Sequence, residues 1–158
     1  MPLPYDTFIF THRTIEGRVV RLGYRLQGPG TQLDMEETLE LPFSPCLQSV
    51  DIADLDAALG GLHLIGGISY WKTCCPPYIQ LEQDNLTQWD SVFWNDVYSR
   101  GLGEFFFRNH IAPDGKVSFP PGRSAGRGSA DLSTLQGPAL LLVGGGKDSI
   151  VSHEILRH

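Results

Sequence analysis

The sequence is poor in cysteine: it has only Cys46, Cys74 and Cys75, and two of these are adjacent. Such a set fits neither a disulfide framework nor the spacing of a zinc site, so we expect free thiols. The first residues, MPLPYDTF, lack a basic patch followed by an apolar segment, and the chain has no run of about 18 apolar residues. The sequence therefore predicts a soluble, cytoplasmic protein without a membrane-spanning segment.

Basic side chains are also scarce, with 12 Lys and Arg against 18 Asp and Glu and a formal net charge of -6. This charge repels the phosphates of nucleic acids and the head groups of anionic lipids, so we expect neither a nucleic acid nor a membrane as a partner. What the chain does have is sufficient length and apolar content. Its 158 residues, 41% of them hydrophobic, are enough for one compact core.

Apolar periodicity predicts an α+β module over residues 1–119. Apolar and polar residues alternate over residues 8–27, and the alternation continues from Leu33. This pattern predicts an antiparallel sheet of about three strands. A further short strand, YIQLEQ, is expected after the break at Pro76 and Pro77.

Two main helices are predicted in the same module. The first follows Asp51 as its N-cap, is weakened by its glycines, and has apolar residues at helical intervals, namely Ile52, Leu55, Leu59, Leu62 and Ile65. The second, QWDSVFWNDVYSR, begins after Thr87 and ends at Gly101. Its core-facing side is expected to consist of Trp89, Val92, Phe93 and Val97.

Beyond the module, residues 120–137 are rich in Pro, Gly and Ser, which predicts a linker or mobile loop. Residues 138–158 are expected to begin an α/β domain, with ALLLV as a buried parallel strand, a glycine turn and a helix start. One strand and about two turns of helix cannot complete a doubly wound domain. We therefore expect a truncated piece of a longer enzyme, inactive alone, with the C-terminal remainder as its partner.

The glycine turn, GGGKDS, has the composition of a phosphate-binding loop. It is not a Walker A motif, because Asp148 follows Gly-Lys where Ser or Thr is needed and Leu141 replaces a glycine. It resembles the Ser-Gly-Gly-x-Asp-Ser loop of the PP-loop ATP pyrophosphatases, with Gly144 in the place of the serine. The alternative is a strand-to-helix turn that binds no ligand.

Two further stretches, GGISYWKTCCP (66–76) and GLGEFFFRNHI (101–111), precede this loop. Together the three resemble the ATP-dependent UDP-N-acetyl-alpha-D-muramoyl-L-alanyl-L-glutamate epimerase family of peptidoglycan synthesis, over roughly residues 60–158. The resemblance implies an isomerase that inverts the terminal L-Glu of UDP-MurNAc-L-Ala-L-Glu and converts ATP to AMP and pyrophosphate. Adenylation of the carboxylate suits this reaction, because the Cα proton of an acyl-adenylate is far more acidic than that of a carboxylate.

The PP-loop resemblance also implies roles for single residues, with ATP and Mg²⁺ as cofactors. Asp148 would help to hold Mg²⁺, and Ser149 would cap the helix and donate to a phosphate oxygen. The pyrophosphate would be bound by Gly144, Gly145, Gly146 and Lys147.

Candidates for the acid, the base and a contact to the substrate lie in the stretches 66–76 and 101–111. Glu104 precedes three phenylalanines, and burial there would raise its pKa, but it can equally be an exposed partner of Arg108. Lys72 either contacts anionic groups of the substrate or extends from an aromatic surface into solvent. Cys74 or Cys75 is either a thiol base or an inert buried cysteine. His110 is expected to be a hydrogen-bonded loop residue, and the other histidines are too scattered for a metal site.

Two other classes of function remain open from the sequence. One is another PP-loop adenylating enzyme, such as an amide ligase or a sulfurtransferase, although the acidic charge disfavours tRNA as a substrate. The other is a truncated domain without catalytic activity.

Overall fold

A computed structural model describes residues 4–42, 50–83, 86–112, 115, 117–120 and 146–157. The chain divides into two compact units, Met1–Gly126 and Arg127–His158, and each is described by itself. Several predicted features lie outside the described residues, namely the linker beyond residue 120, the strand at 139–143, Cys46, Gly144 and Gly145.

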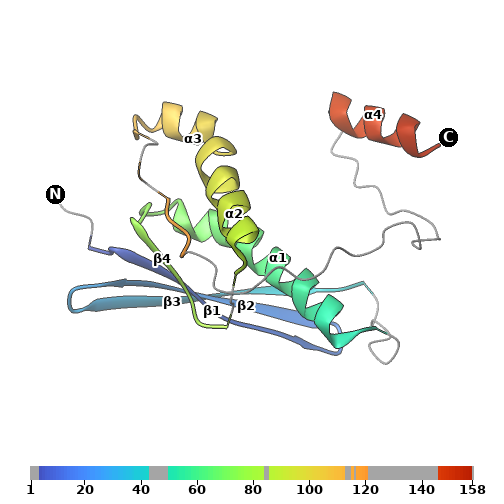
Figure 1. Cartoon of the computed structure of the whole chain (residues 1–158). Coiled ribbons are helices and arrows are strands. Elements are labelled where there is room, and N and C mark those ends of the chain that lie inside the picture. Colours follow the sequence, from blue (N-terminus) through green and yellow to red (C-terminus); the bar gives the residue numbers. More distant parts are fainter. Residues whose placement is uncertain are drawn as a thin grey trace. The chain divides into compact units, whose positions relative to one another are not determined.

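The first unit is built on a four-stranded sheet (Figure 1). Its described strands, in the order β3-β2-β1-β4, are β1 (Thr7–Glu16), β2 (Val19–Gly28), β3 (Thr31–Glu40) and β4 (Tyr78–Leu81). The antiparallel pairing of β1, β2 and β3 confirms the predicted three-stranded sheet, and β4 confirms the short strand after the two prolines. β4 runs parallel to β1, so the sheet is mixed. With the helices below, the α+β class is confirmed.

Two tight turns set the register of the antiparallel strands. β1 and β2 are joined by Gly17 and Arg18, and β2 and β3 by Pro29 and Gly30. Gly17 and Gly30 have φ angles of 59° and 71°, in the left-handed region that glycine enters without a steric penalty. Each strand therefore returns directly along its neighbour.

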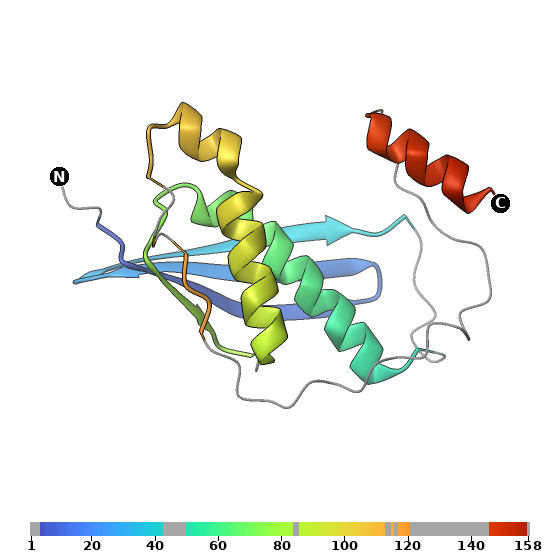
Figure 2. The same ribbon diagram turned by 45° about the horizontal axis from the view of Figure 1, so that its top comes forward.

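The first helix, α1 (Ile52–Trp71), lies on one face of the sheet (Figure 2). The Asp51 carboxylate accepts hydrogen bonds from the backbone N–H of Ala53 at 2.7 Å and of Asp54 at 3.2 Å. These bonds satisfy donors that the first helical turn leaves unpaired, which confirms Asp51 as the N-cap.

Of the apolar residues that predicted α1, Leu59 packs partly against the core, but others do not. Ile52 is 83% exposed, and Leu62 and Ile65 are also exposed. The residues of α1 that are buried are Gly60, His63, Leu64, Gly67 and Trp71. Two glycines therefore belong to the contact surface, and their lack of a side chain permits a close approach of helix and sheet.

The close packing around Gly67 explains why this face of α1 is buried. A Cβ atom at this position would lie 2.4 Å from Cε1 of Phe10, a ring that is only 1% exposed, and 3.1 Å from the hydroxyl of Tyr98. Neither neighbour can move without disturbing the core, because protein interiors are closely packed. The helix lies close to the sheet because this residue has no side chain.

We expect Gly67→Ala to lower the free energy of unfolding by about 1–3 kcal/mol, because the added methyl group overpacks a filled core. Urea unfolding of the 158-residue chain measures this change. The matched control is Gly61→Ala, since nothing lies within 4 Å of a Cβ built at Gly61. That substitution should stabilise the helix by up to about 1 kcal/mol through helix propensity. Equal effects of the two substitutions would contradict the close-approach argument.

A bulge in β1 brings a charged side chain into contact with α1. The register of β1 against β2 shifts between Phe10 and Arg13, which places both residues on the helix-facing side. The Arg13 side chain is only 5% exposed, and its guanidinium donates to the carboxylate of Asp56 at 2.8 Å. Strict alternation along the strand does not predict this ion pair.

The second helix, α2 (Gln88–Arg100), begins as predicted. The Thr87 hydroxyl accepts from the backbone N–H of Asp90 at 3.1 Å, and the Asp90 carboxylate accepts from the backbone N–H of Thr87 at 2.9 Å. This reciprocal capping box confirms Thr87 as the N-cap. Gly101 is confirmed as the residue at the C-terminal end.

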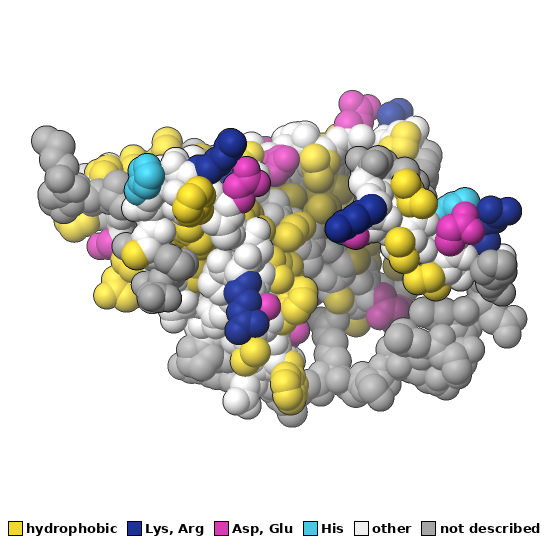
Figure 3. Space-filling model, turned by 90° about the horizontal axis from the view of Figure 1, so that it is seen from above, with side chains coloured by type: hydrophobic (Ala, Val, Ile, Leu, Met, Phe, Trp, Pro, Cys, Tyr) yellow, Lys and Arg dark blue, Asp and Glu magenta, His cyan; other side chains and the backbone are white. Residues whose placement is uncertain are grey.

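The face of α2 that was expected in the core is mostly wrong. Trp89 is 80% exposed, and Val92 and Phe93 are also exposed, whereas Val97 packs partly against the core. Figure 3 shows apolar side chains exposed over α2 between charged ones. The buried residues of α2 are Ser91 and Tyr98.

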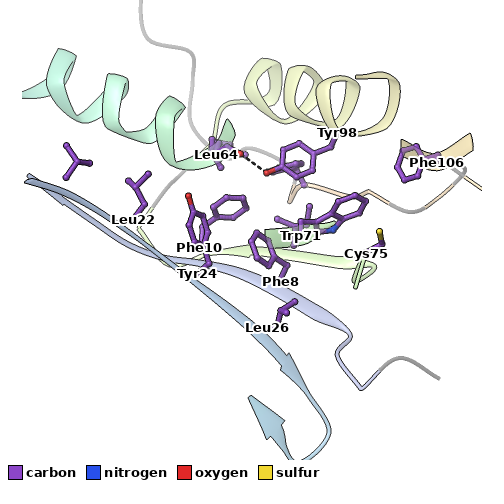
Figure 4. Packing of buried hydrophobic residues seen from close by; sticks show 14 residues of the cluster. Phe8, Phe10, Leu22, Tyr24, Leu26, Leu64, Trp71, Cys75, Tyr98 and Phe106 are labelled. Carbon is purple, nitrogen blue, oxygen red and sulfur yellow. Dashed lines mark hydrogen bonds between the residues drawn. The ribbon is translucent and has the colours of Figure 1, made fainter. Parts of the chain in front are cut away.

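Tyr98 connects α2 to α1. Its ring is fully buried, and its hydroxyl donates a 2.6 Å hydrogen bond to the backbone oxygen of Leu64 (Figure 4). The ring of Trp71 lies edge-on to Tyr98, with 5.7 Å between the centroids. Burial raises the pKa of Tyr98 above its usual value, because desolvation disfavours the phenolate. The hydroxyl therefore remains a donor at neutral pH.

Two shorter helices complete the described structure. α3 (Gly103–Arg108) follows α2 directly, and α4 (Lys147–Leu156) belongs to the second unit, where none of its residues is buried. No helix in the described part of the chain has the length and apolar character needed to span a bilayer.

Candidate functional site

A pocket of about 850 Å³ lies in the first unit between α2, α3 and the segment that follows α3. The part of α2 that lines it is polar and consists of Asn95, Ser99 and Arg100. The remaining described lining is mainly apolar, with Phe106 and Phe107 from α3 and Ile111 and Val117 beyond it. This volume falls in the range of small-molecule sites, roughly 300–1,000 Å³.

The GLGEF stretch forms the corner of this pocket. A Cβ atom on Gly101 would lie 2.4 Å from the backbone oxygen of Val97, so only glycine fits where α2 ends. Gly103 begins α3 and lines the pocket. Sequence reasoning identified this motif but missed the polar residues of α2. The signal was their spacing, because Asn95 and Ser99 stand four residues apart on one helix face directly before the motif.

His110 lies on the pocket rim in an unusual backbone conformation. Its φ angle is 55°, and among the described residues only Cys75 is another non-glycine with positive φ. The turn is held by the backbone N–H of Ile111, which donates to the oxygen of Phe106 at 3.0 Å. The His110 backbone N–H donates to the backbone oxygen of Phe107 at 3.3 Å. Such outliers cost stability and concentrate at functional sites.

Glu104 lies in the first turn of α3, outside the pocket lining. Its side chain is 81% exposed and pairs with Arg108, with 3.3 Å between Oε1 and Nε. Glu104 is therefore not buried, as a raised pKa would require. It is instead an exposed partner of Arg108, which was the alternative expectation. A role for Glu104 in proton transfer stays a prediction.

The SYWK and GLGEFFF stretches pack against each other. Lys72 is the C-cap of α1, and its Nζ lies 5.7 Å from the centroid of the Phe105 ring, within the range of a cation–π contact. The residues next to these two, Trp71 and Phe106, also pack against each other. Their rings meet edge-on, with 6.2 Å between the centroids. The C-terminal end of α1 thereby packs against the middle of α3, and Phe106, which lines the pocket, is held in place by Trp71.

The two described cysteines follow this contact. Cys74 is half-buried, and the hydroxyl of Thr73 lies 3.7 Å from its Sγ. Cys75 is buried, and its Sγ lies 3.7 Å from the backbone oxygen of Lys72. Both are free thiols, as expected. Neither cysteine lines the pocket.

The described part of the proposed phosphate loop lies in the second unit. Gly146 is the N-cap of α4, and it makes no side-chain capping bond. The expectation that Ser149 caps this helix is wrong: its hydroxyl donates to the backbone oxygen of Gly146 at 2.7 Å. A serine in the third helical position lies too far along the helix to precede its first turn. Lys147 and Asp148 are exposed in that first turn.

These residues fit an anion with a bound metal ion. The backbone N–H groups at the start of α4 point toward the helix N-terminus, where negative charge is favoured. Lys147 adds a positive charge, and the exposed carboxylate of Asp148 suits a hard cation such as Mg²⁺. Across the described residues, no group of three or more His, Cys, Asp and Glu side chains is arranged to hold a metal ion by itself.

A second hollow, of about 600 Å³, lies at the sheet, and its charged groups are paired with one another. Arg25 donates to Asp34 at 2.6 Å and to Glu82 at 3.1 Å. Hydrogen bonds from Gln32 and Arg25 hold the pKa of Asp34 below its usual value. Because these charges compensate each other, this hollow is a weaker candidate than the α2–α3 pocket.

The fold and pocket define an α+β domain that has a pocket of small-molecule size at its GLGEF corner. The profile of one family, described as MurL N-terminal domain, matches residues 2–158. The chain belongs to this family. No solved structure matches the chain significantly.

Three curated relatives carry the name UDP-N-acetyl-alpha-D-muramoyl-L-alanyl-L-glutamate epimerase. The protein of Xanthomonas oryzae pv. oryzae is 36% identical over 157 residues, which cover 97% of this chain and 34% of the relative. The protein of Micromonospora sp. is 35% identical over 166 residues, which cover 96% of this chain and 34% of the relative. The protein of Salinispora tropica is 35% identical over 144 residues, which cover 85% of this chain and 29% of the relative. The chain thus spans about a third of the length of these relatives.

Proposed function

We propose that the chain is the N-terminal part of a cytoplasmic, ATP-dependent epimerase that inverts the terminal L-Glu of UDP-MurNAc-L-Ala-L-Glu to D-Glu during peptidoglycan precursor synthesis. The names of the relatives support the substrate and the reaction. The observation that carries the proposal for this chain is the packing of SYWK against GLGEFFF beside the pocket. Two stretches far apart in the sequence thereby build one corner of the molecule.

The proposed chemistry begins with the substrate carboxylate. Its oxygen attacks the α-phosphorus of ATP, the bond between the α and β phosphates breaks, and pyrophosphate leaves. A base then removes the Cα proton of the neutral acyl-adenylate, and an acid returns a proton to the opposite face. Water finally hydrolyses the acyl-adenylate and releases AMP. Adenylation is needed because a proton beside an ionised carboxylate is scarcely acidic.

The residues proposed to hold the nucleotide are assigned from the resemblance of GGGKDS to the PP-loop. The glycines 144–146 and Lys147 bind the pyrophosphate, and Asp148 helps to hold Mg²⁺. Ser149 contacts a phosphate oxygen after its hydroxyl turns away from the backbone oxygen of Gly146, its partner in this structure.

The residues proposed for proton transfer and substrate contact belong to the first unit. Glu104 is proposed for proton transfer, Lys72 for contact with anionic groups of the substrate, and Cys74 as a thiol base. Lys72 and Glu104 are near each other in the fold, because Lys72 lies over the ring of Phe105, the residue next to Glu104. Glu104 requires a less exposed environment for this role than the described residues provide.

The test uses an enzyme of the full length of the relatives that contains this chain. With ATP and Mg²⁺, we expect AMP release to depend on UDP-MurNAc-L-Ala-L-Glu and to be absent with UDP-MurNAc-L-Ala, which has no glutamyl residue to activate. In D₂O, deuterium should enter the glutamyl Cα. The 158-residue chain alone should do neither.

Each other result identifies a different function. AMP release without deuterium at Cα indicates another adenylating enzyme, such as an amide ligase or a sulfurtransferase. The absence of nucleotide turnover indicates a domain without this catalytic role. Either result would overturn the proposal.

A further inference from the structure

We propose that the pocket between α2 and α3 binds the uridine diphosphate end of the substrate. The inference rests on the proposed function, which supplies a uridine nucleotide as the ligand, and it assigns this part of the ligand to named residues. The pocket presents hydrogen-bonding groups on one wall, an apolar floor, and two basic residues without a carboxylate among its described lining residues.

The hydrogen-bonding wall is formed by Asn95 and Ser99. The Asn95 Oδ1 accepts a 2.9 Å hydrogen bond from the backbone N–H of Phe119, so this amide offers its NH₂ group to a ligand. The Ser99 hydroxyl donates to the backbone oxygen of Asn95 at 2.5 Å, so its oxygen is left as an acceptor. The two side chains thus present a donor beside an acceptor.

This pair complements the edge of uracil, where a carbonyl acceptor stands directly beside an N–H donor. The NH₂ group of Asn95 can donate to the carbonyl while the oxygen of Ser99 accepts from the N–H. Adenine also has an acceptor beside a donor. The residues proposed to bind ATP, however, belong to the second unit, which favours the uridine nucleotide for this pocket.

The floor suits the face of a base. Phe106 is only 2% exposed, and its edge-on contact with Trp71 fixes its orientation. Phe107 is 83% exposed and lies at the rim. Of the two rings, Phe107 is the one that offers a face on which a base can stack, because Phe106 is almost completely buried.

Two basic residues can meet the diphosphate. Arg100 is 84% exposed, and its guanidinium contacts Asp96 at 3.0 Å in a solvent-exposed pair, which is weak enough to be exchanged for a phosphate. His110 occupies the left-handed conformation, which among non-glycine residues histidine, asparagine and aspartate adopt most readily. It lines the pocket, so its imidazole is available to a phosphate at the rim.

The experiment titrates the 158-residue chain with UDP and, separately, with uridine, by isothermal calorimetry. Asn95→Asp keeps the acceptor for Phe119 but loses the NH₂ donor, so we expect about tenfold weaker binding of uridine. Arg100→Gln should weaken UDP binding about tenfold and leave uridine binding unchanged. The matched control is Arg108→Gln, an equal change of charge on α3 outside the pocket lining, which should alter neither.

Three results would overturn the inference. The first is the absence of UDP binding at millimolar concentration. The second is equal weakening by Arg100→Gln and Arg108→Gln, which indicates a general charge effect. The third is ADP binding as tightly as UDP with the same sensitivity to Asn95→Asp, which assigns the pocket to adenine nucleotides.

These outcomes are separate from those of the proposed function, because the titration needs no turnover. UDP binding with the expected variant effects, together with no deuterium exchange in the full-length enzyme, would keep the pocket assignment and remove the epimerisation. Deuterium exchange in the full-length enzyme without UDP binding at this pocket would keep the epimerisation and remove the pocket assignment.

Discussion

Asp148→Asn in the full-length enzyme is expected to reduce ATP turnover by at least about 100-fold. The reason is that Asp148 is the only carboxylate in the first turn of α4, next to the N–H groups proposed to bind the phosphates. Asparagine keeps the shape of the side chain but loses the charge that suits Mg²⁺. Release of AMP from ATP in the presence of the dipeptide substrate measures the effect.

The control for this substitution is Glu154→Gln on the same helix. Glu154 carries the same charge, but it pairs with Arg157 at 3.3 Å far from the helix N-terminus. This variant should release AMP at the rate of the unaltered enzyme. Raising the Mg²⁺ concentration should partly restore turnover in Asp148→Asn if the defect is one of metal affinity. AMP release by Asp148→Asn at the unaltered rate would show that the loop does not work as a PP-loop.

Glu104→Gln is expected to slow epimerisation and deuterium exchange at the glutamyl Cα by about 10²–10⁴-fold, the usual contribution of a general acid or base. Nucleotide affinity should remain nearly unchanged, because Glu104 and the proposed nucleotide-binding residues belong to different units. Folding should also be little affected, since the pair of Glu104 with Arg108 is exposed to solvent.

Arg108→Gln separates catalysis from structure at this position. It breaks the same ion pair from the other side and leaves the carboxylate of Glu104 in place. If Glu104 transfers a proton, only Glu104→Gln slows the exchange. If the ion pair merely holds α3, the two variants have the same small effect, and the acid and base must be sought elsewhere, beginning with Cys74.

Much of the first unit follows from local signals in the sequence. The strands follow from alternation, and their turns from glycines that accept positive φ, such as Gly17 and Gly30. The helix starts follow from Asp51 and Thr87, whose side chains bond to the backbone within three residues. The family was also identifiable, because SYWK and GLGEF are continuous stretches. Each of these features depends only on neighbours along the chain.

The faces of the helices were decided by tertiary contacts. In α1, burial of Gly67 is favoured by the fit of Phe10 against a residue without a side chain, and no hydropathy pattern ranks glycine as a contact residue. In α2, the side of the helix that carries Tyr98 is buried and hydrogen-bonded to Leu64, and Trp89 is exposed. A periodic pattern predicts that a helix has an apolar side, but the partner selects which residues are covered.

The candidate site shows the same division between sequence and structure. The sequence by itself determined which chemical groups are available at GLGEFFFRNHI and at GGGKDS, but it did not predict α3, the helix that carries the first of these stretches. Only the tertiary structure brought Asn95 and Ser99 to one pocket with Phe106, joined Lys72 to Phe105, and left Glu104 in solvent. The physical reason is that capping and turn formation act over a few residues, whereas a pocket requires segments distant in sequence to pack together, and their packing depends on side-chain shapes throughout the core.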